Sequence, residues 1–296
     1  MSAPAQEESR MPEGRCLCGA LRFEADPPFQ FMVNCHCSMC RKHHGSPFAT
    51  YVSAPKRSFR WLSGEDRILA YQSSKNGSRT SCSVCGSAVP LVTESWDVAL
   101  VPAGPLEGDL GIKPQAHIFV GSKAAWHTIT DGLPQHDEYP PEFAAPAIER
   151  PKVEARPGVA MGSCLCGESA FEAEGQPMFM QSCHCTRCRR ARGAAHGTNV
   201  FYKAQQFRWL RGADLAVDFK VPDAKFYTVS FCRKCGGPMP RVSVERDMAI
   251  IPAAVLDTDL PMRSQRHIFT NYKAPWFEIT DDQQVYPEAP PMPGRP

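Results

Sequence analysis

Hydrophobic positions along the chain fall in short runs rather than at the spacing of a helix. The runs are rich in β-branched and aromatic residues and are separated by clusters of glycine, proline and serine. Examples are LRFEA at 21–25, FATYVSA at 48–54, VALVPAG at 98–104 and HIFV at 117–120. This pattern predicts a mainly β protein built from short antiparallel sheets.

The same series of motifs occurs twice along the chain. The early motifs return after 148 residues and the later ones after 150, so two residues are inserted between Trp209 and Cys232. Turn residues lie in this interval, Asn76-Gly77 in the first copy and Pro222-Asp223 in the second, where an insertion is tolerated. The repeated motifs are CLCG at 16–19 and 164–167, CHCSMCRK at 35–42 and CHCTRCRR at 183–190, FRWL at 59–62 and 207–210, SCSVCG at 81–86 and FCRKCG at 231–236, and HIFVGSKAAW at 117–126 and HIFTNYKAPW at 267–276.

The repeat predicts two domains. The first is expected at 11–143 and the second at 159–289. Between them, 144–158 contains Pro146, Pro151 and Pro157, which deny backbone donors and favour an extended linker.

Composition narrows the classes of function. Lys and Arg number 33 and Asp and Glu 31, so the net charge of +2 gives no general attraction to nucleic acid or anionic lipid. No stretch resembles a signal peptide or reaches the roughly 18 apolar residues of a membrane span. We therefore expect a soluble, cytoplasmic protein, in which fourteen cysteines are metal ligands rather than disulfide partners.

The spacing of the seven cysteines in each copy predicts two kinds of metal site. A C-x-C pair and a C-x2-C pair together supply the four ligands of a closed, structural zinc site. The remaining C-x-C-x2-C triplet leaves a fourth position open, as in a catalytic zinc site. The predicted closed sites are Cys16, Cys18, Cys82 and Cys85, and Cys164, Cys166, Cys232 and Cys235; the predicted open sites are Cys35, Cys37 and Cys40, and Cys183, Cys185 and Cys188.

Two questions about the triplets stay open at this level. A distant side chain could complete the tetrahedron, which would make the site structural. His36 and His184, inside the triplets, are not assigned as ligands, because three consecutive ligands are sterically awkward.

Basic and imidazole side chains follow each triplet. Arg41 and Lys42 in the first copy, and Arg189 and Arg190 in the second, are candidates for holding the carboxylates of an anionic thiol. The alternative is that they offset the charge of the thiolates. The candidate proton-transfer groups are His43, His44 and His196.

The motifs CLCG, CHCSMCRKHHGSPF, CSVCGS and HIFVGSKAAWHTITDGLP resemble the glutathione-dependent formaldehyde-activating enzyme family, which includes centromere protein V. The resemblance covers nearly all of both copies. It implies a β-tent fold in each domain, with one zinc bound by four cysteines and a second by the triplet, so up to two zinc ions per domain and four per chain. It also implies carbon–sulfur lyase chemistry on the adduct of glutathione and formaldehyde.

The chain departs from this family in two ways. The GSPF at 45–48 becomes GAAH at 193–196, so copy two has a different substrate or an extra ligand, His196, at its triplet. Most relatives have one domain per chain, so the fusion suggests that the two domains pair with each other.

The leading hypothesis is a zinc-dependent lyase acting on S-hydroxymethylglutathione or another adduct of a small thiol. A non-catalytic, zinc-stabilised binding module for a protein or nucleic acid is the alternative, although the charge balance does not favour nucleic acid. A thiol redox sensor ranks last, because the pattern leaves no cysteine free of metal.

Overall fold

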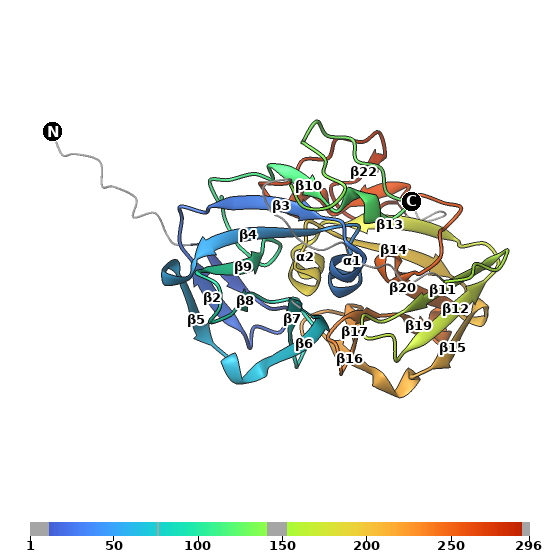
Figure 1. Ribbon diagram of the computed structural model, residues 1–296. Coiled ribbons are helices and arrows are strands. Elements are labelled where there is room, and N and C mark those ends of the chain that lie inside the picture. Colours follow the sequence, from blue (N-terminus) through green and yellow to red (C-terminus); the bar gives the residue numbers. More distant parts are fainter. Residues whose placement is uncertain (1–11, 76, 141–152, 292–296) are drawn as a thin grey trace.

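The computed structural model describes residues 12–75, 77–140 and 153–291. The two copies lie side by side, with the short helices α1 (Ser38–His44) and α2 (Thr186–Arg192) next to each other at the centre (Figure 1). Of the predicted linker, 144–152 lies outside the described residues, so the domain boundaries stay a prediction.

The strands of the first copy pair mostly with their neighbours in the chain. A five-stranded sheet has the order β10-β3-β4-β9-β8, a three-stranded sheet the order β1-β2-β5, and β6 pairs with β7. Single-turn 3-10 helices η1 (Lys56–Ser58), η2 (Glu65–Arg67) and η3 (Val120–Ser122) lie between strands. The strands are β1 (Glu13–Arg15), β2 (Arg22–Ala25), β3 (Phe31–Cys35), β4 (Ala49–Pro55), β5 (Phe59–Ser63), β6 (Ile68–Ser74), β7 (Gly77–Cys82), β8 (Leu91–Val92), β9 (Val98–Pro102) and β10 (Ala116–Ile118).

The second copy repeats this plan with small differences. Its main sheet has the order β19-β20-β14-β13-β21-β22, and the smaller sheets are β11-β12-β15 and β16-β17-β18. The strands are β11 (Val159–Ser163), β12 (Ala170–Glu174), β13 (Phe179–Cys183), β14 (Gly197–Tyr202), β15 (Phe207–Arg211), β16 (Ala216–Lys220), β17 (Thr228–Cys232), β18 (Pro238–Met239), β19 (Arg241–Ser243), β20 (Met248–Pro252), β21 (Arg266–Ile268) and β22 (Gln284–Val285). The 3-10 helices are η4 (Ala204–Gln206), η5 (Ala213–Leu215), η6 (Val244–Arg246), η7 (Ala253–Val255) and η8 (Thr270–Tyr272).

The prediction of a mainly β protein with short antiparallel sheets is confirmed, with two additions. The strands that contain the HIF motifs pair in parallel, β10 with β3 and β21 with β13. A cysteine at the N-cap and a left-handed glycine at the C-cap bound each short helix, Cys37 and Gly45 for α1 and Cys185 and Gly193 for α2. At seven residues each, α1 and α2 cannot span a bilayer, nor can any other helix in the described ranges.

Each copy lacks part of its own hydrophobic core. The core of the first copy, built around Phe23, Met32 and Val101, contains Trp276 from the second copy, which is only 3% exposed. The core of the second copy contains Trp126 from the first, which is 5% exposed. The two KAxW segments are therefore exchanged between the copies, and each tryptophan fills the space that the other copy's sheets leave.

The copies also approach each other closely behind the closed cysteine sites. Gly86 has a φ of 69°, and a Cβ there would lie 2.3 Å from the ring of Phe231 in the other copy. Gly236 has a φ of 71°, and a Cβ there would lie 2.2 Å from Ser81 Oγ. Glycine is required at both positions for its left-handed backbone and for this contact.

The position of each tryptophan predicts which copy is destabilised when that tryptophan is removed. Replacing Trp276 with alanine should cost about 3–5 kcal/mol, the usual range for deleting a buried tryptophan. Because the cavity opens in the first copy, amide hydrogen exchange should rise more in β4 and β9 than in β14 and β20. Trp126→Ala is the matched variant and should show the opposite pattern. If amide hydrogen exchange in the Trp276→Ala protein rose more in β14 and β20 instead, this would contradict the packing of Trp276 in the core of the first copy.

Candidate metal centres

The structure brings together the two sets of cysteines predicted to form closed sites. In the first copy, Cys16 and Cys18 lie in the turn after β1, while Cys82 ends β7 and Cys85 follows it. The four Sγ atoms all lie within 4.8 Å of one another, and the equivalent set in the second copy does the same. All four members are buried except Cys18, which is half-buried.

The sulfur spacing suits a tetrahedral metal ion. Zinc–sulfur bonds of about 2.3 Å place the sulfurs of a tetrahedron about 3.8 Å apart, whereas a disulfide would bring two sulfurs to about 2.05 Å. The Sγ atom of Cys18 lies 3.4 Å from that of Cys16 and 3.7 Å from that of Cys82. The distances in the second copy are 3.3 and 3.9 Å. All fourteen cysteines are free thiols, so these sets could hold metal ions.

Each triplet is assembled where a strand enters a helix. Cys35 ends β3, Cys37 is the N-cap of α1, and Cys40 lies within α1. The amide of Cys40 donates to Cys37 Sγ at 3.3 Å, a contact that favours the thiolate. The three Sγ atoms lie within 4.8 Å of one another in both copies. No other His, Cys, Asp or Glu within the described ranges joins either group, so each triplet has three ligands.

Within each triplet the pKa values of the thiols are shifted in opposite directions. Hydrogen bonds from Cys183 and Cys188 lower the pKa of Cys185 to about 3, and those from Cys35 and Cys37 lower the pKa of Cys40 well below its usual value. Hydrogen bonds within the triplet, together with burial, raise the pKa of Cys183. The most readily deprotonated sulfur is thus that of Cys40 in the first triplet and that of Cys185 in the second.

A hydrogen-bonded chain of side chains runs away from each triplet. His36 Nε2 lies 2.8 Å from His117 Nδ1, and His117 Nε2 lies 3.0 Å from a carboxylate oxygen of Asp131. In the second copy the chain is His184, His267 and Asp281, with distances of 2.8 and 3.1 Å. The imidazoles between the cysteines are thus held by the HIF histidines. Neither aspartate was predicted from the sequence, although ITD recurs at 129–131 and 279–281 and could have indicated them.

The basic residues after the triplets contact the opposite copy or their own backbone. Lys42 Nζ lies 2.6 Å from Asp257 Oδ1 and donates to Ser163 Oγ at 2.6 Å. Its counterpart Arg190 forms an ion pair at 2.6 Å with Glu107. Arg189 donates a hydrogen bond to the carbonyl of Gly104, and Arg41 donates one to the carbonyl of His36.

The substrate-binding role expected of Lys42 and Arg190 stays a prediction, and the structure adds that both side chains join the two copies. The sequence could not show it, because each acidic partner is distant in the chain and belongs to the other copy.

The candidate proton-transfer histidines are neutral groups in buried positions. Burial lowers the pKa of His44 to about 4, and its ring is hydrogen-bonded to the hydroxyl of Tyr51 and to the carbonyl of Arg192. Burial also lowers the pKa of His43 and His196 well below the usual value. Each is therefore uncharged near pH 7.

His196 fills an aromatic position rather than joining the cysteines. Its Nδ1 lies 3.1 Å from Thr198 Oγ1, and its ring centroid lies 5.5 Å from that of Phe277. In the first copy Phe48 and His127 occupy the equivalent positions, also 5.5 Å apart. Histidine and phenylalanine have thus changed places within one ring pair, which accounts for the departure from GSPF without an extra metal ligand.

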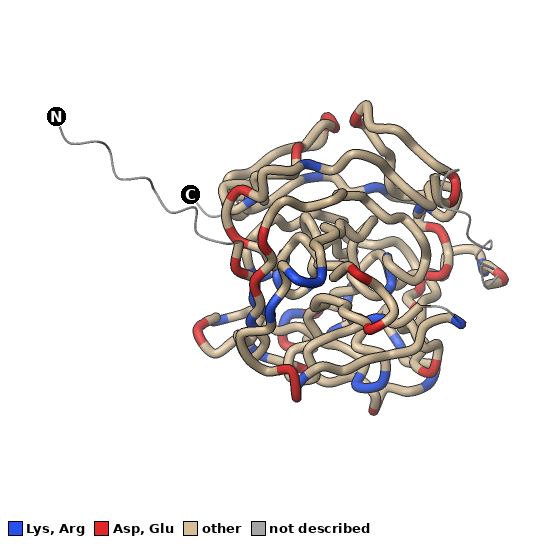
Figure 2. Tube along the Cα trace, turned by 60° about the vertical axis from the view of Figure 1, so that its left-hand side comes forward, with Lys and Arg blue, Asp and Glu red and all other residues tan. Residues whose placement is uncertain are grey.

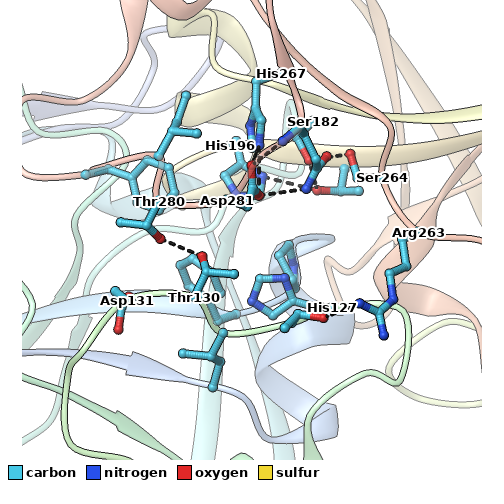
Figure 3. A pocket seen from close by; sticks show the side chains of 18 of the residues that line it. His127, Thr130, Asp131, Ser182, His196, Arg263, Ser264, His267, Thr280 and Asp281 are labelled. Carbon is cyan, nitrogen blue, oxygen red and sulfur yellow. Dashed lines mark hydrogen bonds and ion pairs between the residues drawn. The ribbon is translucent and has the colours of Figure 1, made fainter.

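A cavity of about 320 Å³ lies where the two copies meet (Figure 3). Matching residues from the two copies line it, and Thr130 Oγ1 lies 2.5 Å from Thr280 Oγ1 across the junction. Asp131 and Asp281, the ends of the two histidine chains, also line the cavity. None of the fourteen cysteines does, so the cavity is separate from the metal centres.

Two more residues contact the triplets and were not predicted. Arg79, in β7, reaches the sulfurs of the first triplet, and the hydroxyl of Tyr227 reaches Cys188 of the second at 3.4 Å. Both lie far from their triplets in the chain, so no local motif could indicate the contact.

The fold and these centres define a duplicated, mainly β protein with four cysteine clusters able to hold metal ions. The model of the family described as glutathione-dependent formaldehyde-activating enzyme matches residues 11–122 and 159–272. The chain therefore belongs to this family, with two tandem copies, and the predicted resemblance is confirmed.

Three similar proteins each match less than half of this chain. A Halomonas elongata protein, provisionally named a glutathione-dependent formaldehyde-activating enzyme, is 31% identical over 126 residues, which cover 40% of this chain and 80% of that protein. An uncharacterized lyase of Schizosaccharomyces pombe is 32% identical over 77 residues, 26% of this chain and 54% of its own length. A crystal structure of a Rhodobacter sphaeroides protein is 26% identical, covers 33% of this chain and 89% of that chain, and gives a TM-score of 0.28.

The two ion pairs between the copies should differ in their contribution to stability. The side chains of Lys42 and Asp257 are only 11% and 12% exposed, so Lys42→Met leaves a buried, unpaired carboxylate and should cost about 3–5 kcal/mol. Arg190→Met is the matched variant; because Glu107 is 45% exposed, it should cost about 1 kcal/mol or less. Chemical denaturation of the two variants measures the difference. A Lys42→Met protein with native stability but weaker substrate binding would support the substrate-binding role predicted for Lys42.

Proposed function

We propose that the chain is a zinc-dependent carbon–sulfur lyase that acts at the triplets on an adduct of a small thiol and an aldehyde. Glutathione is the proposed thiol and S-hydroxymethylglutathione the proposed adduct, in line with the names of the family and of the Halomonas relative. The observation that carries the proposal is the three-sulfur group in each copy, which no fourth ligand atom joins among the described His, Cys, Asp and Glu residues.

The reaction needs an activated sulfur and a proton carrier. When bound, zinc would act as a Lewis acid that lowers the pKa of a thiol or polarises a carbonyl oxygen. In the direction of adduct formation, a bond forms between the thiol sulfur and the carbonyl carbon while the carbonyl π bond breaks. The proton lost by the thiol ends on the carbonyl oxygen, and the reverse reaction releases thiol and aldehyde.

Different residues of the chain have different roles in this reaction. The sulfurs of Cys35, Cys37 and Cys40 would hold the metal, and the amide of Cys40 orients Cys37 by donating to its sulfur. The closed site would clamp the end of β7 to the turn after β1. His44 is neutral and hydrogen-bonded to Tyr51, so it adds no positive charge beside Cys40.

The distribution of charge supports a small-molecule substrate over a nucleic acid. Among the described residues, Lys and Arg are interspersed with Asp and Glu along the trace (Figure 2). Arg189 and Arg190, within the main basic cluster of the sequence, contact the other copy. We infer a cytoplasmic location, which the fourteen free thiols support.

The first test of function is exchange of formaldehyde with glutathione, followed by NMR. Zinc-loaded protein should accelerate the exchange, and a variant with both Cys37→Ser and Cys185→Ser should not, because each triplet has then lost a ligand. Ser95→Ala, an exposed substitution away from the clusters, is the control. Equal rates with and without native protein would reject this substrate and favour the binding-module alternative.

Metal content should separate the two kinds of site. Purified protein should contain four zinc ions per chain by elemental analysis. Cys82→Ser should lose one ion and unfold at a much lower temperature, since structural zinc contributes roughly 10–16 kcal/mol in small domains. Cys37→Ser should also lose one ion but shift the melting temperature much less. Two ions per chain in the native protein would show that the triplets hold no metal.

A further inference from the structure

Arg79 places a permanent positive charge on the first triplet. Its Nη2 atom lies 3.3 Å from Cys40 Sγ and 3.8 Å from Cys37 Sγ. Its Nη1 atom donates to Ser73 Oγ and lies 3.8 Å from Met39 Sδ, so the guanidinium is held between β6 and α1. A guanidinium cannot lose its proton in a protein, and this charge is therefore fixed.

The second triplet has a neutral group in the corresponding place. The shift of 150 residues aligns Arg79 with Val229, which is buried, and aligns Gly77 with Tyr227. Positions two apart in an extended chain point to the same side, so both copies reach their triplet from the same side of the hairpin. Tyr227 meets Cys188 Sγ at 3.4 Å with a hydroxyl group, which is uncharged.

Another arginine near the second triplet is directed elsewhere. Arg192 follows Cys188 on α2, but its guanidinium lies against the first copy, where a Cβ on Gly45 would be 2.9 Å from Nη1. Its carbonyl accepts a hydrogen bond from His44 of that copy if the imidazole carries its proton on Nδ1. Arg192 is therefore part of the contact between the copies and interacts with Cys188 only through its charge, whereas Arg79 contacts the sulfurs of its triplet directly.

The difference between the triplets changes which fourth ligand each metal accepts. Three thiolates and one divalent cation sum to a single negative charge, and Arg79 neutralises it in the first copy. At the first triplet an anionic fourth ligand then adds its charge beside a guanidinium that contacts the sulfurs directly, whereas at the second triplet Arg192 offsets the charge only from a distance. Because the attraction between charges falls with distance, an anionic ligand is less favourable at the second triplet.

We propose that Arg79 is a specificity-determining residue that makes the first triplet the anion-accepting metal site of the chain. Its ligand is an anionic thiolate or a comparable small anion, and the second triplet takes neutral ligands. The inference rests on the proposed function, in that both triplets must hold a metal with an open position. It assigns the thiol chemistry chiefly to the first copy.

Cobalt(II) in place of zinc tests the proposal by absorption spectroscopy, without an activity assay. One triplet at a time is removed from the full chain, with Cys185→Ser plus Cys188→Ser or with Cys37→Ser plus Cys40→Ser. The cobalt left in the remaining triplet is then titrated with azide, an anionic probe, and with imidazole, a neutral one. Closed sites, with four thiolates, do not bind either probe and serve as an internal reference for folding.

Azide should bind the first triplet about 10- to 100-fold more tightly than the second, the size of effect of a charge-assisted hydrogen bond. Arg79→Val, which copies the second repeat, should remove this advantage and leave imidazole binding unchanged. Arg79→Lys should retain part of it. The reciprocal change, Tyr227→Gly with Val229→Arg, should strengthen azide binding at the second triplet.

The outcomes separate the inference from the proposed function. Equal azide affinities at the two triplets, or an Arg79→Val protein that binds azide as the native protein does, would overturn the inference alone. Failure of cobalt to enter the triplets would overturn both.

Discussion

The packing of Trp126 and Trp276 into each other's copy is the constraint on which the rest of the structure depends. Neither set of sheets closes its core without the tryptophan of the other. Since a buried tryptophan contributes several kcal/mol, a large part of the stability of a domain, the two copies stabilise each other. In the same arrangement α1 and α2 lie next to each other at the centre (Figure 1), and the cavity lies where the two copies meet.

The cysteine clusters are tied to this arrangement through their strands. Within β7, Cys82 belongs to the closed site and Arg79, three residues earlier, contacts the triplet. A metal ion that fixes the end of the strand would therefore also fix the guanidinium beside the second metal centre. The glycine after Cys85 packs on Phe231, so the closed site is also held by the other copy.

Duplication within one chain has let the two copies diverge. A homodimer of single domains must keep both sites alike, whereas two copies in one chain can accept a change in only one of them. The charged group at the first triplet and the neutral one at the second are such a change. The exchange of histidine and phenylalanine between Phe48 with His127 and His196 with Phe277 is another, and it preserves the ring contact in both copies.

The sequence alone determined the features that depend on nearby residues. Alternating short apolar runs predicted the β class, and the repeat predicted two copies of one motif series. Cysteines one or two residues apart must lie close in space, so the grouping into pairs and triplets followed from spacing.

Only the tertiary structure decided the contacts between distant parts of the chain. The structure shows which copy each tryptophan completes. It also pairs Lys42 with Asp257, 215 positions away, and brings Arg79 to Cys40, 39 positions away. Such contacts depend on how the sheets pack, and no local pattern of residue types specifies them. The structure therefore added contacts within and between the copies for the four residues predicted to bind substrate, and it revealed a charged neighbour of the first triplet that no motif contains.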